Sequence, residues 1–156
     1  MLFVNLIDKM NYFRFLFQSS NQHGVHSPFV FNFLTKSIYR PYRNTRKRKK
    51  YFIDQSISYF KPKNIVDFRH TTPSDINTTL DMLIFRPNQL DTVLQNDLID
   101  CFTNDTVGII DCRKSSKNDY EKLCQHPKTT VVLHFYWYIV FFIRKEQQKE
   151  LFFLRL

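Results

Sequence analysis

Apolar residues in the first third of the chain recur with the spacing of a helix. The opening segment places Leu6, Met10, Phe13 and Phe17 on one line, three and four residues apart. This spacing predicts an amphipathic helix, because residues three and four apart lie on the same face of a helix. The polar segment 18–24, which contains a glycine, should end this first helix.

A second helix is expected to begin at Ser27-Pro28. A serine side chain can cap the first turn, and proline needs no N–H partner at the first helical position. Val30, Leu34 and Ile38 then share one face and should be buried. A third helix is expected over residues 51–60, after a basic segment.

Beyond residue 60 the pattern changes to short apolar runs separated by turns. Such runs predict buried strands, and the more periodic segments between them predict helices. Segment 90–103 fits either a strand followed by a helical turn or a single helix. The expected strands are 65–68, 106–111, 129–135, 138–143 and 151–154, and the expected helices are 74–85 and 117–126.

This alternation predicts an α/β fold with a mainly parallel sheet of about five strands. The closing strands are expected to be antiparallel, at one edge. An N-terminal helical region over residues 1–60 should pack against an α/β region over residues 61–156, and the two together should form one compact domain. The length of 156 residues agrees with a single domain.

The amino acid composition limits the kinds of functional site that the chain can form. Apolar residues make up 43% of the chain, which excludes disorder over its whole length. The chain has only 2 glycines and no alanine, so glycine-rich phosphate-binding loops are absent. His23 and His26 place two imidazoles close together, but zinc needs three or four ligands and no second pair stands at ligand spacing. We therefore expect no metal site.

The positive charge is concentrated in one segment. The net charge is +9, and residues 36–50 hold eight Lys or Arg and no acid. Such a run can bind phosphate, nucleic acid or an anionic membrane surface, or it can be a solvated basic loop, which is the favoured interpretation. The residues expected to make any weak polyanion contact are Arg40, Arg43, Arg46, Lys47, Arg48, Lys49 and Lys50.

The cysteines and the apolar runs predict the cellular compartment of the protein. Cys101, Cys112 and Cys124 cannot all pair within one chain, and the opening residues lack the basic start of a signal peptide. The longest apolar run, Val131 to Ile143, is shorter than the ~18 residues of a membrane span. A cytoplasmic protein with reduced thiols is expected. Cys112 follows an expected strand and is interpreted as a buried, unreactive thiol, so no catalytic residue is assigned.

The most specific stretch is NQHGVHSPFVFNF, residues 21–33. It resembles the N-terminal signature, roughly HGxHSPFVF, of a bacterial family of class I S-adenosylmethionine-dependent methyltransferases. SYFKPKNIVD, residues 58–67, is similar to the family's approach to its first Rossmann strand. NDTVGIID, residues 104–111, looks like the family's fifth strand, and residues 126–156 look like its closing strands.

The resemblance implies a reduced Rossmann-like sheet of methyltransferase type, preceded by helices. It also implies S-adenosylmethionine as cofactor, with two cofactor-binding acids. Asp67 would help to position the amino acid portion of the cofactor, and Asp111 would lie near the site of methyl transfer.

The chain also departs from the family pattern. The loop after the first strand, residues 68–74, contains no glycine, although the backbone must approach the methionine moiety closely there. Only about 20 residues separate the expected helix 74–85 from the NDTVGIID strand, where relatives have further strand–helix units. The paired acids of the family appear here as Asp111-Cys112. The sequence therefore predicts a degenerate methyltransferase-like protein with impaired cofactor binding. The alternative is a non-catalytic basic module that binds nucleic acid or another anionic partner.

Overall fold

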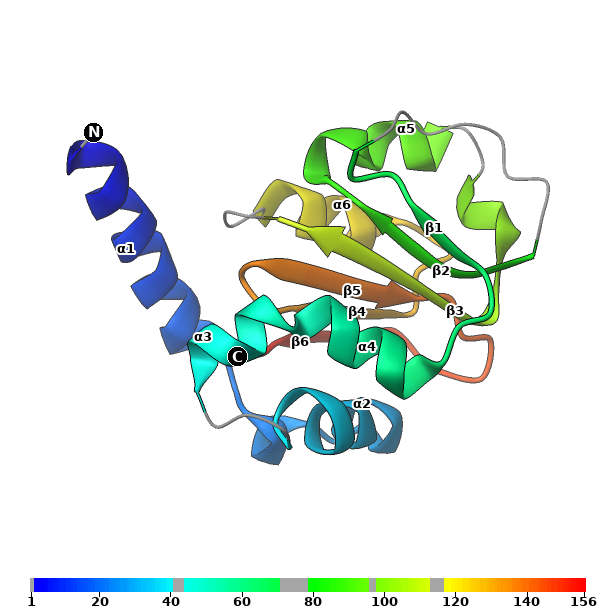
Figure 1. Cartoon of the computed structure of the whole chain (residues 1–156), viewed down its shortest axis with the longest axis horizontal. Helices are drawn as coiled ribbons and strands as arrows, with labels where there is room; N and C mark the ends of the chain where they lie inside the picture. The colour runs from blue at the N-terminus through cyan, green and yellow to red at the C-terminus, as the bar shows by residue number, and fades with distance from the viewer. Residues whose placement is uncertain (1, 41–43, 71–78, 96–97, 113–116) are drawn as a thin grey trace.

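A computed structural model describes residues 2–40, 44–70, 79–95, 98–112 and 117–156 of the chain. Its centre is a six-stranded sheet in the order β1-β2-β3-β5-β4-β6 (Figure 1). The expected α/β class is thus confirmed, with six strands in place of about five. The strands are β1 (Ile65–Asp67), β2 (Leu80–Phe85), β3 (Phe102–Asp111), β4 (Val131–His134), β5 (Tyr138–Phe142) and β6 (Glu150–Phe153).

Helices surround this sheet and precede it. Short 3-10 turns cover Gln22–Gly24, Pro87–Gln89 and Leu98–Cys101, and a π-helical turn, Leu34–Ile38, continues the second helix. The α-helices are α1 (Leu2–Gln18), α2 (Pro28–Phe33), α3 (Thr45–Lys50), α4 (Phe52–Phe60), α5 (Leu90–Gln95) and α6 (Lys117–Gln125).

Strand directions correct the expected closing arrangement. β1, β2 and β3 are parallel, and β5 is antiparallel to both of its neighbours, β3 and β4. The edge strand β6 pairs in parallel with β4. The expectation of antiparallel closing strands at one edge is therefore correct only for β5, which lies inside the sheet. A tight turn between β4 and β5 makes this inversion, whereas β6 returns through a longer connection.

The expected helix over residues 74–85 is wrong where the structure describes it. Residues 80–85 form β2, a central strand between β1 and β3, and residues 71–78 lie outside the described ranges. Met82 and Ile84 are buried on one face of the sheet, and Leu83 and Phe85 on the other. A strand covered on both faces has a continuous apolar run, which periodicity cannot distinguish from a buried helix.

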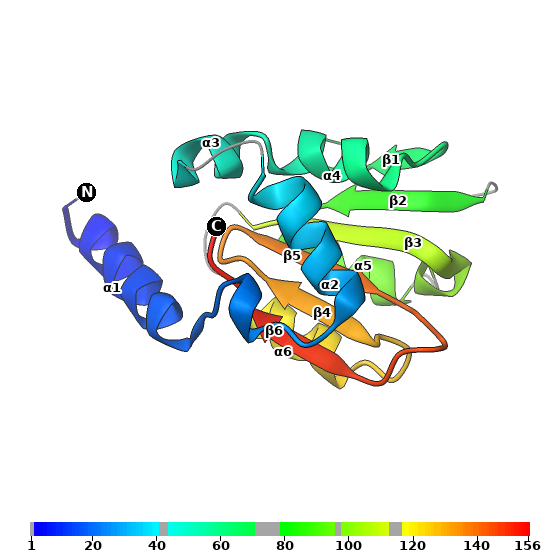
Figure 2. The same cartoon turned by 90° about the horizontal axis from the view of Figure 1, so that it is seen from below.

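The sheet lies between two layers of helices (Figures 1 and 2). α2 and α4 cover one face, where Val30, Phe33 and Phe52 pack in a common cluster with β-strand residues such as Val107. α5 and α6 cover the other face through Val93, Leu123 and their neighbours. The predicted face of the second helix is confirmed, because Val30, Leu34 and Ile38 are fully buried.

The start of α2 differs in detail from the expectation. Pro28 occupies the first turn as expected, but the Ser27 side chain makes no cap hydrogen bond to the helix. The buried Ser27 hydroxyl instead accepts a hydrogen bond from the Gln147 side-chain amide at 3.2 Å. The serine thus ties the helix start to the segment before β6.

The predicted first helix is confirmed as α1, which extends away from the sheet in both views (Figures 1 and 2). Phe15 is buried, with its ring 5.1 Å from the His134 ring. Of the four residues that define the predicted apolar line, Met10, Phe13 and Phe17 are exposed, and the side chain of Leu6 lies outside the described part of the structure. The line therefore lies opposite the face that packs on the protein.

Candidate functional site

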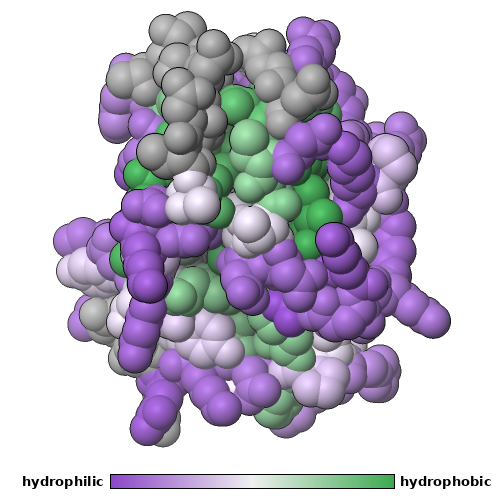
Figure 3. Space-filling view, turned by 90° about the vertical axis from the view of Figure 1, so that its right-hand side faces the viewer, coloured by the Kyte–Doolittle hydropathy of each residue, from purple (hydrophilic) through white to green (hydrophobic). Residues whose placement is uncertain are grey.

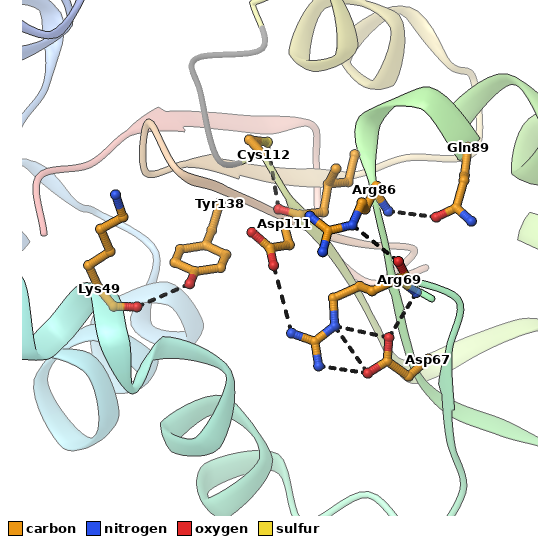
Figure 4. A network of polar contacts seen from close by, with 9 residues as sticks. Lys49, Asp67, Arg69, Arg86, Gln89, Asp111, Cys112 and Tyr138 are labelled. Carbon is orange, nitrogen blue, oxygen red and sulfur yellow. Dashed lines mark hydrogen bonds and ion pairs between the residues drawn. The ribbon is translucent and has the colours of Figure 1, made fainter. Parts of the chain in front are cut away.

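The carboxyl ends of the parallel strands meet at one edge of the sheet. Asp67 is the last residue of β1, Asp111 is the last residue of β3, and Arg86 directly follows β2. Open α/β sheets bind their ligands beyond these strand ends. The structure therefore brings the two acids predicted from the resemblance, Asp67 and Asp111, to one place (Figure 4).

A single arginine lies between the two acids. Arg69 Nε donates to both carboxylate oxygens of Asp67, at 3.0 and 3.1 Å, and Arg69 Nη2 donates to Asp67 Oδ2 at 2.7 Å. The Arg69 backbone N–H also donates to Asp67 Oδ1 at 3.0 Å. On the other side, Arg69 Nη1 lies 3.7 Å from Asp111 Oδ2. Both carboxylates thus have a cationic partner within the chain.

The electrostatics of this network keep it charged. Partial burial of Asp67 would raise the pKa of its carboxyl, but the hydrogen bonds and the charge of Arg69 outweigh burial and lower it. The hydrogen bond to Asp67 raises the pKa of Arg69, against a smaller opposing effect of burial. The side chains of Asp67 and Arg69 are 34% and 25% exposed, so water screens part of this attraction.

Further hydrogen bonds hold the loop that carries Arg69. Arg86 Nε donates to the Arg69 carbonyl oxygen at 3.1 Å, and the Gln89 side-chain amide donates to the Phe68 carbonyl oxygen at 2.8 Å. Gln89 Oε1 in turn accepts from the Arg86 backbone N–H at 2.8 Å. These bonds fasten residues 68 and 69 to the segment after β2, so the guanidinium is held in place from behind (Figure 4).

The other side of the site is closed by buried aromatic and thiol groups. The Tyr138 hydroxyl donates to the Lys49 carbonyl oxygen at 3.0 Å, and its ring stacks on Phe52 at 4.3 Å. Burial raises the pKa of Tyr138 to about 12. Cys112 is buried as predicted, and burial, followed by the nearby carboxylates, raises the pKa of its thiol far above neutrality. Cys112 is therefore a protonated thiol and a poor nucleophile.

Residues 45–50 of the basic segment form the short helix α3 and not a loop. The Asn44 side chain caps it by accepting from the Arg46 backbone N–H at 2.8 Å. Three cations lie over aromatic rings: Arg48 over Tyr39, Lys49 over Trp137 and Lys50 over Tyr51, at 4.7, 4.3 and 5.0 Å from the ring centroids. Arg40, Arg46, Lys47 and Lys50 are exposed, and Arg43 lies outside the described residues.

The amino ends of the parallel strands form the opposite end of the sheet. Apolar side chains reach the surface there between hydrophilic ones (Figure 3). A groove of about 460 Å³ at this end is lined by Phe102, Ile143, Lys128 and other residues. Lys128 pairs with Asp100, and Arg144, also in the lining, pairs with Glu146. The cations of this groove are thus partly neutralised by neighbouring acids.

The remaining candidates are not brought together. His23 and His26 lie in and just after a 3-10 turn, and the described part of the chain holds no cluster of three or more metal-ligating side chains. Cys101 and Cys124 are unpaired, as is Cys112. Among the helices within the described ranges, none combines the length and apolar character needed to cross a membrane.

Sequence reasoning named both acids as candidate residues but did not name Arg69, which lies between them. The signal was the Asp67-x-Arg69 spacing at the end of a strand, which lets an arginine fold back on the preceding carboxylate. Arg86, Gln89 and Tyr138 carried no recognisable motif. No protein-family model, curated protein or solved structure matched the chain when it was compared with them.

Proposed function

We propose that this chain is a methyltransferase-like protein in which an internal ion pair has taken the place of the S-adenosylmethionine site. The observation that carries the proposal is the position of Arg69 between Asp67 and Asp111, the two acids that the resemblance assigns to the cofactor. The protein would then act without methyl transfer, as a binding or structural protein.

The arrangement of the sheet supports the methyltransferase-like part of the proposal. Of the three parallel strands, β1 and β3 end in an acid, and the inverted strand β5 pairs with β3. A reduced α/β sheet preceded by helices is what the resemblance implies. The helix that begins at Pro28, within the HGVHSPFVF segment, packs on this sheet through Val30 and Phe33.

The chemistry of the site supports the loss of cofactor binding. The methionine portion of S-adenosylmethionine carries an ammonium group and a carboxylate, and its sulfonium gives it a net positive charge. Asp67 would have to accept the ammonium, yet both of its oxygens already accept from the Arg69 guanidinium. A guanidinium at this place repels a second cation and fills its space, so the residues present do not fit the cofactor. We therefore derive no methyl-transfer step.

Calorimetric titration of the full chain with S-adenosylmethionine tests the proposal. The wild-type protein should bind more weakly than about 1 mM, a free energy of only ~4 kcal/mol. Arg69→Gly frees both acids and returns a glycine to the loop, so it should bring binding into the measurable range. Arg46→Gly on α3 is the matched control and should behave as wild type. Micromolar binding by the wild-type chain would overturn the proposal, and an unimproved Arg69→Gly variant would exclude Arg69 as the cause.

The second candidate function is binding of an anionic partner through the basic segment. The exposed cations Arg46, Lys47 and Lys50 on α3 favour it. If α3 binds duplex DNA, replacing residues 46–50 by glutamine should flatten the dependence of log affinity on log salt, by up to about 0.9 per lost phosphate contact. An unchanged salt slope would show that the segment does not contact DNA.

A further inference from the structure

α1 presents a row of large apolar side chains to solvent. Met10, Phe13 and Phe17 are 51%, 61% and 90% exposed, although phenylalanine belongs to the residues most often found inside proteins. They lie three and four residues apart, so they occupy one face of the helix. We call these three residues the α1 stripe.

The opposite face of α1 already packs on the protein. Phe15 is buried against the rings of His134 and Tyr136, and the Tyr12 ring lies 5.0 Å from the Trp137 ring. The Tyr136 hydroxyl also donates to the backbone carbonyl of Asp8 at 2.9 Å. The helix is therefore docked by its rear face, and the exposed α1 stripe lies on the opposite face.

The charges beside the α1 stripe are positive. Lys9 and Arg14 are exposed, and each lies four residues from a stripe member, Lys9 from Phe13 and Arg14 from Met10, on opposite sides of the row. Asp8, the only acid within α1, is half-buried and lies toward the rear face. The exposed face thus combines aromatic side chains with flanking cations.

More cations lie at the same end of the molecule. Trp137 contacts Tyr12 of α1 on one side, and the Lys49 ammonium of α3 lies over its ring at 4.3 Å. Trp137 therefore contacts both α1 and α3. The two helices lie at the same end of the sheet (Figures 1 and 2). The exposed side chains of Arg46, Lys47 and Lys50 add positive potential near the α1 stripe.

We propose that the α1 stripe binds the surface of an anionic lipid bilayer. Phe13 and Phe17 insert at the boundary between headgroups and acyl chains, while Lys9 and Arg14 reach the anionic headgroups. α3 adds longer-range attraction to the same surface, which each nearby cation strengthens. A second copy of the chain is a poorer occupant, because its stripe brings the same flanking cations and no acid to pair with them.

This inference names the partner of the second candidate function and does not depend on the Asp67–Arg69 ion pair. Its test is co-flotation of the full chain with vesicles of phosphatidylcholine, with or without phosphatidylserine. The wild-type protein should float with the anionic vesicles and less with the neutral ones, and added salt should weaken binding. Trp137 is the only tryptophan, so energy transfer from it to a labelled lipid gives a second readout.

The decisive variant is Phe13→Ser/Phe17→Ser. Removing two aromatic anchors should reduce vesicle partitioning by about a hundredfold. Asn11→Ser/Gln18→Ser, at two exposed polar positions of the same helix, is the matched control and should bind as wild type. Phe13→Leu/Phe17→Leu should retain most of the binding. Circular dichroism of each variant verifies that α1 is still formed.

Several results would overturn the proposal. One is vesicle binding that is unchanged in Phe13→Ser/Phe17→Ser. Another is a wild-type chain that fails to bind vesicles but forms a dimer that this double variant dissociates, since the stripe would then bind a second copy. Binding of duplex DNA without binding of vesicles would assign the basic end to nucleic acid. None of these results bears on the S-adenosylmethionine titration, so the two proposals fail separately.

Discussion

Two regions of this molecule differ in whether their functional side chains are paired within the protein or exposed to solvent. At the carboxyl end of the parallel strands, Asp67 and Asp111 share the cation of Arg69, and further bonds from Arg86 and Gln89 hold the loop. On α1, large apolar side chains and cations face solvent. Internally paired groups have little to offer a ligand, so we expect binding at α1 and not at the strand ends.

The largest predicted loss of stability comes from disrupting the sheet that carries Asp67 and Asp111. Gly108 of β3 lies opposite Phe141 of β5, and a Cβ at Gly108 would stand 2.2 Å from the Phe141 ring. Phe141 is fully buried and stacks on Phe102 at 5.3 Å, so its ring has no free space to enter. Gly108→Ala should lower the free energy of unfolding by roughly 3 kcal/mol in urea titrations.

A double-mutant cycle supplies the control for Gly108. Phe141→Leu removes the ring atoms that the new Cβ would meet, so Gly108→Ala should cost much less in that background. Equal costs in both backgrounds would show that the clash is relieved elsewhere. The α1 stripe should still bind vesicles wherever the variant remains folded, because it lies outside the sheet.

The second-largest predicted effect on stability concerns His134, which lies on the surface that α1 contacts. His134 is buried among Phe15, Tyr120 and Phe153, and neither ring nitrogen has a hydrogen-bond partner among the residues that the structure describes. Burial lowers the pKa of His134 from 6.5 to about 4. The unfolded chain therefore binds a proton at higher pH than the folded one. Stability is lost as the pH falls below 6.5, and this loss stops near pH 4.

His134→Phe should remove this dependence. The variant should exceed the wild type in free energy of unfolding by about 1 kcal/mol at pH 7, because two unpaired nitrogens are replaced by carbon. At pH 5 the titration of the wild-type histidine should add about 2 kcal/mol to the difference. Urea unfolding of both proteins across pH 7 to pH 5 measures this. A difference that does not grow toward acid pH would contradict the low pKa of His134.

The sequence could predict which segments have periodic apolar residues, but not which face of a segment packs against the rest of the protein. Val30, Leu34 and Ile38 were placed correctly because a helix buried on one face has a clear period. Leu80 to Phe85 were misassigned because a strand buried on both faces has none. On α1 the apolar spacing indicated a helix, yet the docked face is the one with Tyr12 and Phe15. Which of two apolar faces is covered depends on tertiary contacts.

The candidate site shows the same limit. The resemblance pointed to Asp67 and Asp111, because each is the last residue of a strand in a recognisable segment. The role of Arg69 depends on the distance between two strand ends that lie more than forty residues apart in the chain, which no local pattern encodes. The two acids could therefore be predicted as candidate residues, but the cation that lies between them could not.

A smaller effect is expected from opening the ion pair itself. Arg69→Ala leaves two partly buried carboxylates facing each other and should cost about 1 kcal/mol at pH 7, after screening by water. The pKa of Asp67 is lowered in the folded protein, so its stabilising contribution exists above the unfolded pKa, about 3.9. It is lost as the pH falls through the folded value. The difference between the two proteins should therefore shrink below about pH 4.

Two further variants sharpen the test of Arg69. Arg69→Lys keeps the charge without the planar fork and should recover only part of the stability. Lys117→Ala breaks an exposed pair with Glu121 and should have no measurable effect. Should Lys117→Ala prove as costly as Arg69→Ala, the network at the strand ends would be no stronger than an ordinary surface pair.

The smallest effect should be confined to the docking of α1. Tyr136→Phe removes the hydroxyl that donates to the Asp8 carbonyl at 2.9 Å but keeps the ring against Phe15. Burial raises the pKa of Tyr136, so the hydroxyl stays protonated and able to donate. Losing this bond should weaken docking by about 0.5 kcal/mol, which corresponds to roughly twofold faster amide hydrogen exchange in α1. Tyr59→Phe on α4 is the control and should leave exchange in α1 unchanged.

The rear face and the α1 stripe are separate surfaces, so Tyr136→Phe should bind vesicles as wild type does. Loss of vesicle binding in this variant would show that docking of α1 and binding by the stripe are coupled.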